Sequence, residues 1–392
     1  MQLPNFSSWL QALPVAQLRA LTLVGVLVGV WIVFAILTDG LFLSPRNLTT
    51  LATQVAITAI LAVGIVMVMV PGHIDLSIGS AVAFTGVFAA LLIDPVRGWG
   101  ITTDPLLICI LTIGVGLLIG MWQGFWVAWM GVPAFIVTLA SLLALRGAAL
   151  TITGGSTVTH NGILTFLAAD FISATWTAGA MAVVVFGYSI IKYFDWRARS
   201  RISDPDRPLS FLAVAGLPVL LMGLLAVGVT AVAFSYRGTP VSMAILGLVI
   251  AIVAFLMLRT VFGRHLYAIG GNPSAAAYAG IKVKWNVFFA FILLGALYAV
   301  AGLILDGRVG VAVPNAGIAL ELSVIAAAVI GGTSLFGGIG TPLGAVIGAL
   351  LLESLNNGMG LMNIDTNFQM IANGLVLLVA VYIDKRARAS GR

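Results

Sequence analysis

Ionisable side chains inside apolar stretches are the residues of this sequence best suited to chemistry, and they are few. Four of them interrupt apolar runs: Asp75, Arg146, Glu321 and Glu353. In a lipid-embedded helix each is costly unless it faces a partner, a watery cavity or the interface. Asp75 is expected to cap backbone N–H groups at a helix end, and Arg146 and Glu321 to snorkel to an interface. A continuous proton relay would need more carboxylates at mid-span.

Nucleophiles and metal ligands are scarcer still. The chain has one Cys, Cys109, which lies in an apolar run, and three scattered His residues. These supply neither a nucleophile–base pair nor a metal cluster. The sequence contains no Gly-x-x-x-x-Gly-Lys-Ser/Thr phosphate-binding loop. The sequence therefore predicts a protein that is not an enzyme, with no catalytic residue, metal ligand or cofactor of its own.

The composition excludes most soluble classes. Of 392 residues, 61% are hydrophobic and 8% are charged, and the mean hydropathy is +1.14. Soluble domains carry about 25% charged residues. An ordinary cytosolic enzyme, a disordered chain and a nucleic-acid binder are thereby excluded. The sequence predicts a polytopic membrane protein in which residues 1–392 form a single transmembrane domain.

A helix needs about 20 apolar residues to cross the hydrocarbon core. Twelve runs are candidates: 20–38, 51–70, 77–93, 105–130, 133–153, 172–194, 209–234, 240–260, 285–305, 318–335, 339–355 and 367–384. The run 77–93 is weak, and only a Gly-rich break separates 318–335 from 339–355. We therefore expect an all-α bundle of 10 to 12 transmembrane helices, of which one or two are re-entrant or broken.

Lysine and arginine concentrate in cytoplasmic loops and so set the orientation. Placing both termini in the cytoplasm leaves only Arg46, Arg97, Arg237 and Arg308 in outside loops. The residues then assigned to the cytoplasmic side are Arg19, Lys192, Arg197, Arg199, Arg201, Arg207, Arg259, Arg264, Lys282, Lys284, Lys385, Arg386, Arg388 and Arg392. The first span lacks signal-peptide features and is expected to be retained. The compact loops favour a bacterial plasma membrane.

Glycines are ordered in two ways. They recur every fourth residue at Gly116, Gly120 and Gly124 and again at Gly340, Gly344 and Gly348. Such small faces predict closely packed helices. Gly- and Pro-rich breaks also interrupt apolar runs at 67–79 and 330–340. These breaks indicate either discontinuous helices of an internal repeat near a substrate path or two tight cytoplasmic turns.

The cytoplasmic loop 261–284 contains a complete short helix signature. Asn272 suits the N-cap, Pro273 the first helical position and Gly280 the C′ position. A helix of seven residues is unstable alone, so its own protein or a partner must hold it. Its small side chains favour docking into a groove of another protein. The alternative, an amphipathic helix lying on the membrane, lacks the usual Leu, Phe or Trp.

Four segments carry a resemblance to a known family. Residues 263–281 resemble the coupling-helix signature of sugar permeases in the ribose, galactose and xylose group of ABC importers. Residues 72–80, Gly-His-Ile-Asp-Leu-Ser-Ile-Gly-Ser, resemble a second signature of that family, and 132–140 and 327–335 match two more. The likeness spans roughly residues 40–160 and 236–384. Residues 172–234 hold two extra spans around a basic loop, Asp195–Pro208, a layout similar to that of the D-xylose permeases.

This resemblance implies a fold like that of the vitamin B12 permease, the type II ABC importer bundle with broken helices. It implies a homodimer in the bacterial inner membrane, a periplasmic sugar-binding protein, and a cytosolic ATPase that holds ATP and Mg²⁺. The implied function is the permease subunit of an ATP-driven importer of a monosaccharide, with D-xylose favoured. The alternative is a proton-coupled secondary sugar transporter. Whether the ATPase is one fused chain or two stays open.

Two sets of candidate site residues follow. For coupling to the ATPase, the resemblance and the loop signature select Arg264, Tyr267, Gly270, Gly271, Asn272, Ala275, Ala276, Ala277 and Gly280. Of these, Tyr267, Gly270, Gly271 and Asn272 are expected to set the shape of the loop, and Ala275 to Ala277 to form the docking peg. For the translocation path, polar residues near the spans are Gln54, Asp75, Ser77, Trp122, Gln123, Asn315, Glu321 and Asn357.

Overall fold

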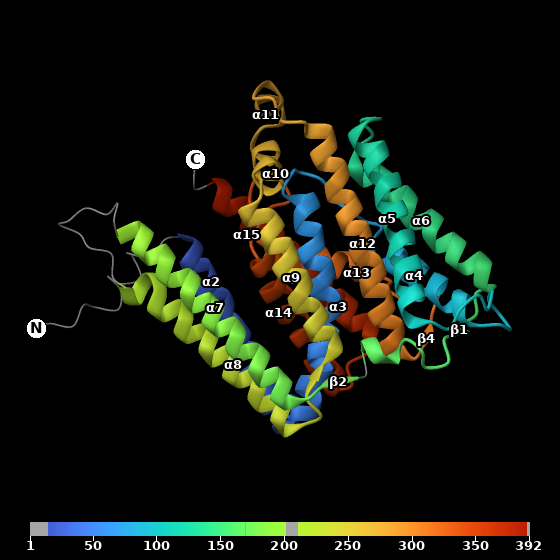
Figure 1. Ribbon diagram of the computed structural model, residues 1–392, viewed down its shortest axis with the longest axis horizontal. Helices are drawn as coiled ribbons and strands as arrows, with labels where there is room; N and C mark the ends of the chain where they lie inside the picture. The colour runs from blue at the N-terminus through green and yellow to red at the C-terminus, as the bar shows by residue number, and fades with distance from the viewer. Residues whose placement is uncertain (1–14, 169, 201–210, 390–392) are drawn as a thin grey trace, which may run out of the picture.

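The computed structural model describes residues 15–168, 170–200 and 211–389, and these are mostly helical (Figure 1). The helices are α2 (Val15–Leu37), α3 (Pro45–Met69), α4 (Ile78–Ile93), α5 (Pro105–Ala128), α6 (Ala134–Thr153), α7 (Ala174–Ser200), α8 (Leu217–Ser235), α9 (Val241–Arg259), α10 (Val261–Gly271), α11 (Pro273–Tyr278), α12 (Val283–Val309), α13 (Leu320–Ile330), α14 (Pro342–Leu361) and α15 (Thr366–Ala389). Short 3-10 turns lie at Leu41–Leu43 and Thr165–Leu167, and a π-helical turn at Leu212–Gly216. The strands are β1 (Val158–Thr159), β2 (Phe171–Ile172), β3 (Thr239–Pro240) and β4 (Val311–Ala312).

Each of the twelve apolar runs falls on a helix, which confirms the expected all-α polytopic membrane fold. In the described part of the chain, seven helices are long and apolar enough to cross a membrane: α3, α5, α6, α7, α8, α9 and α12. By contrast, α4 has 16 residues and α13 has 11. At about 1.5 Å per residue these reach about 24 and 17 Å, short of a core about 30 Å thick. They are the two partial helices.

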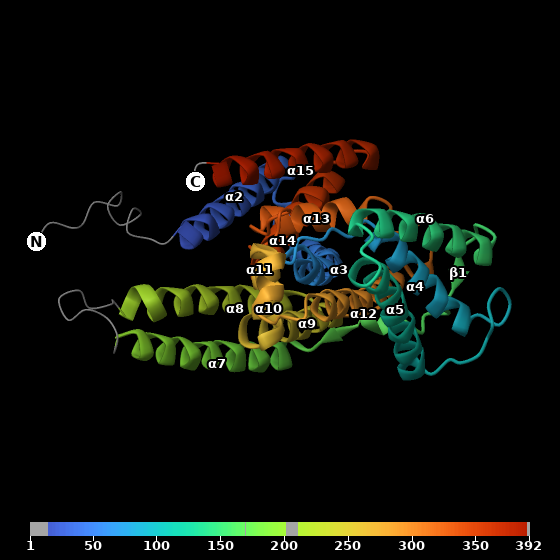
Figure 2. The ribbon, with the colours of Figure 1, turned by 90° about the horizontal axis from the view of Figure 1, so that it is seen from above.

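Helix α3 forms the centre of the bundle. Its side chains from Val55 to Val70 are buried, and α9, α12, α13 and α14 all pack against it. Figure 2 shows α3 end-on among these helices, with α5 and α6 on one side and α2 and α15 covering α13 and α14. The core of the molecule is therefore a helix enclosed by other helices rather than by lipid.

The periodic glycines lie in helix contacts, as expected, except Gly340, which precedes α14 and whose Cβ position lies nearest side-chain atoms of Thr333 and Val70. A Cβ at Gly116 or Gly120 of α5 would come within 3.0 Å of the backbone of α12 at Gly295 or Phe291. Glycines of α14 approach the backbone of α13 in the same way, at Gly344 and Gly348. Close backbone approach substitutes for the hydrophobic driving force that lipid removes.

Replacing Gly120 with alanine is expected to lower the detergent melting temperature of the chain. The added methyl overlaps backbone of α12, and such overpacking costs about 1–3 kcal/mol. Gly114, on the same helix, has open space around its Cβ position, so Gly114→Ala serves as the matched control. Equal melting temperatures for the two variants would contradict this account of the α5–α12 contact.

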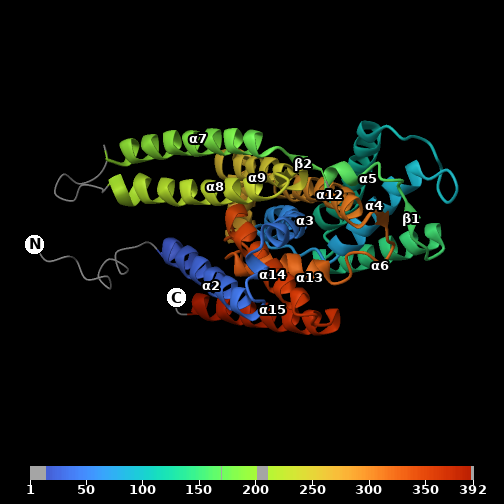
Figure 3. The ribbon, with the colours of Figure 1, turned by 90° about the horizontal axis from the view of Figure 1, so that it is seen from below.

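The expected insertion 172–234 is a helical hairpin, α7 and α8, which projects from the bundle (Figures 1 and 3). Its two ends are joined at the base because β2 pairs antiparallel with β3, Phe171 opposite Pro240 and Ile172 opposite Thr239. In the predicted basic loop, residues 201–208 lie outside the described residues. A second pairing, β1 with β4, joins the end of α6 to the end of α12.

Candidate functional site

Two half-helices meet head to head inside the bundle. Residues 70–77 run from the end of α3 to α4 without helix, and residues 310–319 run likewise from α12 to α13. The starts of α4 and α13 lie close together, because a Cβ at Gly79 would overlap the carbonyl oxygen of Gly317, just before α13, and the carboxylate of Glu321 in its first turn. The sequence break at 67–79 thus marks a discontinuous helix. The second break, at 330–340, follows α13. The non-helical segment that precedes α13 contains Gly310, Pro314 and Gly317, a Gly–Pro signal that sequence reasoning missed.

A buried polar cluster fixes the start of α4. The Asp75 Oδ1 atom accepts hydrogen bonds from the backbone N–H and the hydroxyl of Ser77, both at 2.7 Å. The Tyr298 hydroxyl of α12 donates to the other Asp75 oxygen. Gln123 of α5 donates to the Ser77 hydroxyl at 2.6 Å. All four residues are buried, so the Asp75 cluster (Asp75, Ser77, Gln123 and Tyr298) ties three segments together. Asp75 accepts the backbone N–H of Ser77, which is itself the N-cap residue of α4, and not the N–H groups of the first helical turn that the predicted capping role requires.

The second half-helix is held by Arg146 of α6. Its guanidinium donates to the carbonyl oxygens of Pro314 at 2.8 Å and Ala316 at 2.7 Å. Glu321 stands in the first turn of α13, where the helix dipole favours an acid, and it interacts electrostatically with Arg146. These contacts give Arg146 and Glu321 partners within the protein, and their location near a membrane interface stays a prediction. Both side chains interact with the segment that leads into α13: Arg146 with Pro314 and Ala316, and Glu321 with the backbone of Ala319.

The coupling loop is a helical pair rather than one short helix. The helix expected after Asn272 is α11, and the Asn272 side chain accepts from the backbone N–H of Ala275 at 3.0 Å, as an N-cap. Gly280 ends it with φ of 83°. The preceding residues, expected to form a shaped loop, instead form α10. Figure 1 shows both helices beyond one end of α3 and α9.

Helix α10 packs against both Gly-rich breaks, the one that follows α3 at Val70 and the one that precedes α14 at Gly338 and Gly340. The Tyr267 hydroxyl donates to the carbonyl oxygen of Gly340 at 2.6 Å, and burial raises the pKa of this phenol, which keeps its proton available to donate. A Cβ at Gly270 would overlap the carbonyl oxygen of Val70 and the backbone nitrogen of Gly338. Gly338 itself donates to Val70 at 2.8 Å. A displacement of α10 must therefore move both segments.

Helix α11 exposes only two of the three alanines expected to form the docking peg. Ala276 is 5% exposed and faces the chain itself, because it lies on the side of α11 that turns toward the bundle. Ala275 and Ala277 are exposed, as is Arg264 on α10. Tyr278 is 93% exposed. Ala276 therefore belongs to the inner contact of α11, and Tyr278, which the sequence analysis did not select, dominates its outer face.

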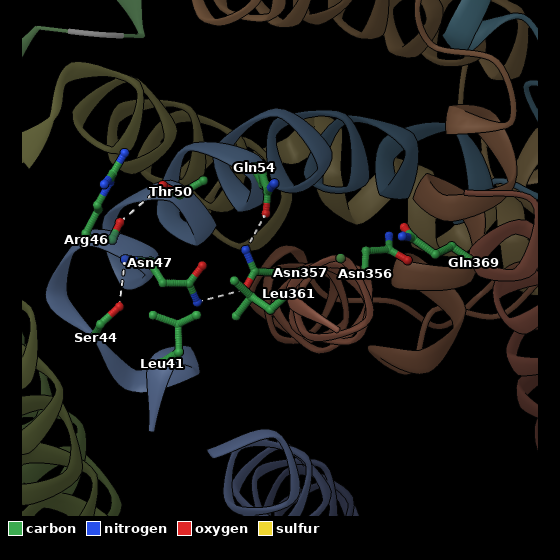
Figure 4. A pocket seen from close by; sticks show the side chains of 11 residues that line it. Leu41, Ser44, Arg46, Asn47, Thr50, Gln54, Asn356, Asn357, Leu361 and Gln369 are labelled. Atoms are coloured by element: carbon green, nitrogen blue, oxygen red, sulfur yellow. Dashed lines mark hydrogen bonds between the residues drawn. The ribbon is translucent and has the colours of Figure 1, made fainter. Parts of the chain in front are cut away.

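The path candidates other than Glu321 fall into four places. Gln54 and Asn357 line a cavity of about 520 Å³ and are hydrogen-bonded to each other at 3.2 Å (Figure 4). Trp122 lies on the outer surface of α5, and Asn315 is exposed in the segment before α13. Asp75, Ser77 and Gln123 belong to the Asp75 cluster. The eight candidates thus form no single path.

Sequence reasoning also missed Asp306, a buried acid near the end of α12. The predicted apolar run 285–305 ends just before Asp306, whereas α12 continues to Val309. Its backbone carbonyl contacts the His160 ring at 3.1 Å. Asn47 was missed too, although it repeats the polar spacing of Gln54 along α3.

Comparison with known proteins agrees with these features. The family described as "Branched-chain amino acid transport system / permease component" matches residues 47–381. The "Xylose transport system permease protein XylH" of Escherichia coli (strain K12) is 39% identical over 374 residues, covering 95% of this chain and 93% of that protein. Its Haemophilus influenzae namesake is 40% identical over 354 residues, covering 90% of this chain and 92% of that protein.

The "Ribose import permease protein RbsC" of Haemophilus influenzae is 33% identical over 343 residues, 88% of this chain and 86% of that protein. No solved structure matches the chain. The family match covers well over half of the chain, and the relatives align over nearly their whole length. The chain therefore belongs to this family of transport-system permease components.

Proposed function

We propose that this chain is the membrane permease subunit of an ATP-driven importer of D-xylose. The observation that carries the proposal is the alignment with a xylose permease over 95% of the chain at 39% identity. The ribose permease aligns over 88% at 33%. The half-helices α4 and α13 support a transport role, because discontinuous helices lie near substrate paths in membrane transporters.

The proposal includes an orientation and a set of partners. Both termini and the α10–α11 pair face the bacterial cytoplasm, where lysine and arginine gather. A separate ATPase docks there and holds ATP and Mg²⁺, since this sequence has no phosphate-binding loop. Two copies of the chain form the translocation unit in the inner membrane, and a periplasmic binding protein delivers the sugar.

Coupling would then pass from α11 through α10 to the helix breaks. A push on the exposed face of α11 moves α10, which contacts Val70 through Gly270 and Gly340 through Tyr267. Val70 follows α3 directly, and Gly340 precedes α14. Packed backbones transmit such a displacement because they have no free space in which to absorb it. The ATPase can thus shift α3 and α14 against each other.

The experiment is a pull-down from detergent with the purified chain as bait, followed by an ATPase assay with and without a xylose-loaded binding protein. We expect to recover a cytosolic ATPase whose activity rises with the loaded binding protein. Failure to recover an ATPase, together with sugar uptake into proteoliposomes on a pH gradient, would replace the proposal with a secondary transporter.

Truncating Tyr278 to alanine is expected to weaken ATPase binding about tenfold or more, because exposed aromatic anchors dominate interface energies. Its side chain is 93% exposed, so its removal leaves the fold intact. The measurement is the ATPase affinity of the purified permease in nanodiscs. Val96→Ala is the control, since Val96 is 88% exposed and lies after α4, away from α11. Unchanged affinity in Tyr278→Ala would remove Tyr278 from the interface.

A further inference from the structure

A cavity lies at the end of α3 that is farthest from α10 and α11. Its walls come from the start of α3, the end of α14, the start of α15 and the Leu41–Leu43 turn (Figure 4). The lining residues of α3 extend to Gln54, 15 residues before the end of α3 at Met69, so about 22 Å of helix separates this cavity from the coupling end. The cavity volume of about 520 Å³ falls in the usual range of small-molecule sites, about 300–1,000 Å³.

The lining is rich in primary amides. Five of the lining side chains are Asn47, Gln54, Asn356, Asn357 and Gln369. Each amide offers both donors and an acceptor, so it suits a hydroxyl group, which also donates and accepts. Among the described residues, no carboxylate and no aromatic ring line the cavity, and its one charged lining residue is Arg46, which is exposed and whose guanidinium can also donate to hydroxyl oxygens. The chemistry therefore fits a neutral solute with several hydroxyl groups and offers no stacking surface to hold it tightly.

Hydrogen bonds within the protein fix these amides in place. Asn47 Nδ2 donates to Asn357 Oδ1 at 2.8 Å, and Asn357 Nδ2 donates to Gln54 Oε1 at 3.2 Å. Figure 4 shows Asn357 between Asn47 and Gln54. Among the residues that the structure describes, the Gln54 Nε2 group makes no hydrogen bond, so this donor is free for a solute in the cavity.

A polar contact continues inward from the cavity along the same two helices. One turn beyond Gln54 on α3, the Thr58 hydroxyl donates to Glu353 of α14 at 2.5 Å. Residues four apart lie on one face of a helix, so Gln54 and Thr58 share a face of α3, and Glu353 and Asn357 share a face of α14. The α3–α14 contact is thus polar from the cavity into the bundle.

We propose that this amide-lined cavity binds a neutral polyhydroxy solute weakly, as the outer waiting site of the transported sugar. This inference rests on the proposed function, because the orientation that puts α11 in the cytoplasm puts the cavity on the side where sugar arrives. Weak binding suits this role, since a waiting site must release its solute inward. The α3–α14 contact that the coupling helices are placed to shift is also the wall of the cavity.

The test is saturation-transfer NMR with millimolar D-xylose and the full chain in nanodiscs, without any partner protein. We expect transfer to xylose in the parent chain and a fall of about threefold or more in Gln54→Leu, the size that loss of one hydrogen bond produces. Thr50→Val is a second variant, because Thr50 is exposed in the cavity and its hydroxyl bonds only to the backbone of Arg46. Thr103→Val is the control, because Thr103 is an exposed threonine between α4 and α5, outside the cavity.

The outcomes separate this inference from the proposed function. Equal transfer in the parent chain, Gln54→Leu and Thr103→Val would overturn the site, even if ATP-driven xylose uptake by the full complex is intact. A loss confined to Gln54→Leu and Thr50→Val, with unchanged melting temperatures, supports the site. A complex that hydrolyses ATP but imports no xylose refutes the proposed substrate, and transfer to xylitol that depends on Gln54 would still establish a polyhydroxy site.

Discussion

Gly270→Ala is expected to uncouple ATP hydrolysis from sugar uptake. The new methyl would overlap the backbone of Val70 and of Gly338, and neither is the movable tip of a flexible side chain. Helix α10 must therefore tilt away from both breaks, at a cost of about 1–3 kcal/mol. The outer face of α11 with Tyr278 stays intact, so the ATPase still binds. We expect sugar imported per ATP hydrolysed to fall about tenfold, measured in proteoliposomes with the complete importer.

The neighbouring glycine provides a matched control for this effect. A Cβ at Gly271 meets nothing within 4 Å, so Gly271→Ala makes the same chemical change one residue away without overlap. It is expected to couple as the parent chain does. If Gly270→Ala also kept its coupling while Gly271→Ala lost it, the force would have to travel by another contact than the one between α10, Val70 and Gly338.

The helical framework was accessible from sequence because its signals are local. Apolar length marks each span wherever the chain lies, and the caps of α11 depend on Asn272 and Gly280 within the same short segment. The regularly spaced glycines of α5 and of α14 can likewise be recognised from the sequence of each helix alone. Such features need no knowledge of which helix packs on which.

Helix α10 shows where local signals fail. It contains Gly263, Gly270 and Gly271, and glycine is about 1 kcal/mol less favourable than alanine in a helix, so propensity favours a loop. Tertiary contacts decide otherwise, because Leu266 and Ile269 are buried against the bundle. Tertiary packing also buries Ala276. The sequence of α11 could not predict this, because Ala275, Ala276 and Ala277 are identical side chains and only packing decides which of them is buried.

The amide-lined cavity could not be assembled from sequence either. Asn47 and Asn357 are 310 residues apart and meet only because α3 packs on α14. Sequence reasoning selected Gln54 and Asn357 as isolated polar residues, but it also selected Trp122 and Asn315, which lie elsewhere. Residue type can suggest which polar side chains are candidates for a binding site, but helix packing determines which of them line the same cavity.

The Asp75 cluster yields the other large expected effect. Asp75→Ala removes the acceptor of two bonds from Ser77 and one from Tyr298. Buried donors without partners cost about 1–3 kcal/mol each, so we expect this variant to lose most of its folded yield and several degrees of detergent melting temperature. Asp75→Asn retains an oxygen toward Ser77, and Tyr298 can accept from the new amide, so its loss should be much smaller.

Removing the partner distinguishes a hydrogen-bonded cluster from a charge used in transport. In Tyr298→Phe the hydroxyl bond to Asp75 disappears, and the carboxyl keeps its bonds to Ser77. If the cluster is structural, Asp75→Ala and Tyr298→Phe should both lower the melting temperature, and the double variant should lose less than the sum, because both changes remove the bond between Tyr298 and Asp75. Strictly additive losses would show that the two residues act separately. A fall in uptake without any fall in stability for Asp75→Asn would instead assign the carboxylate to the transport cycle, since only its charge differs.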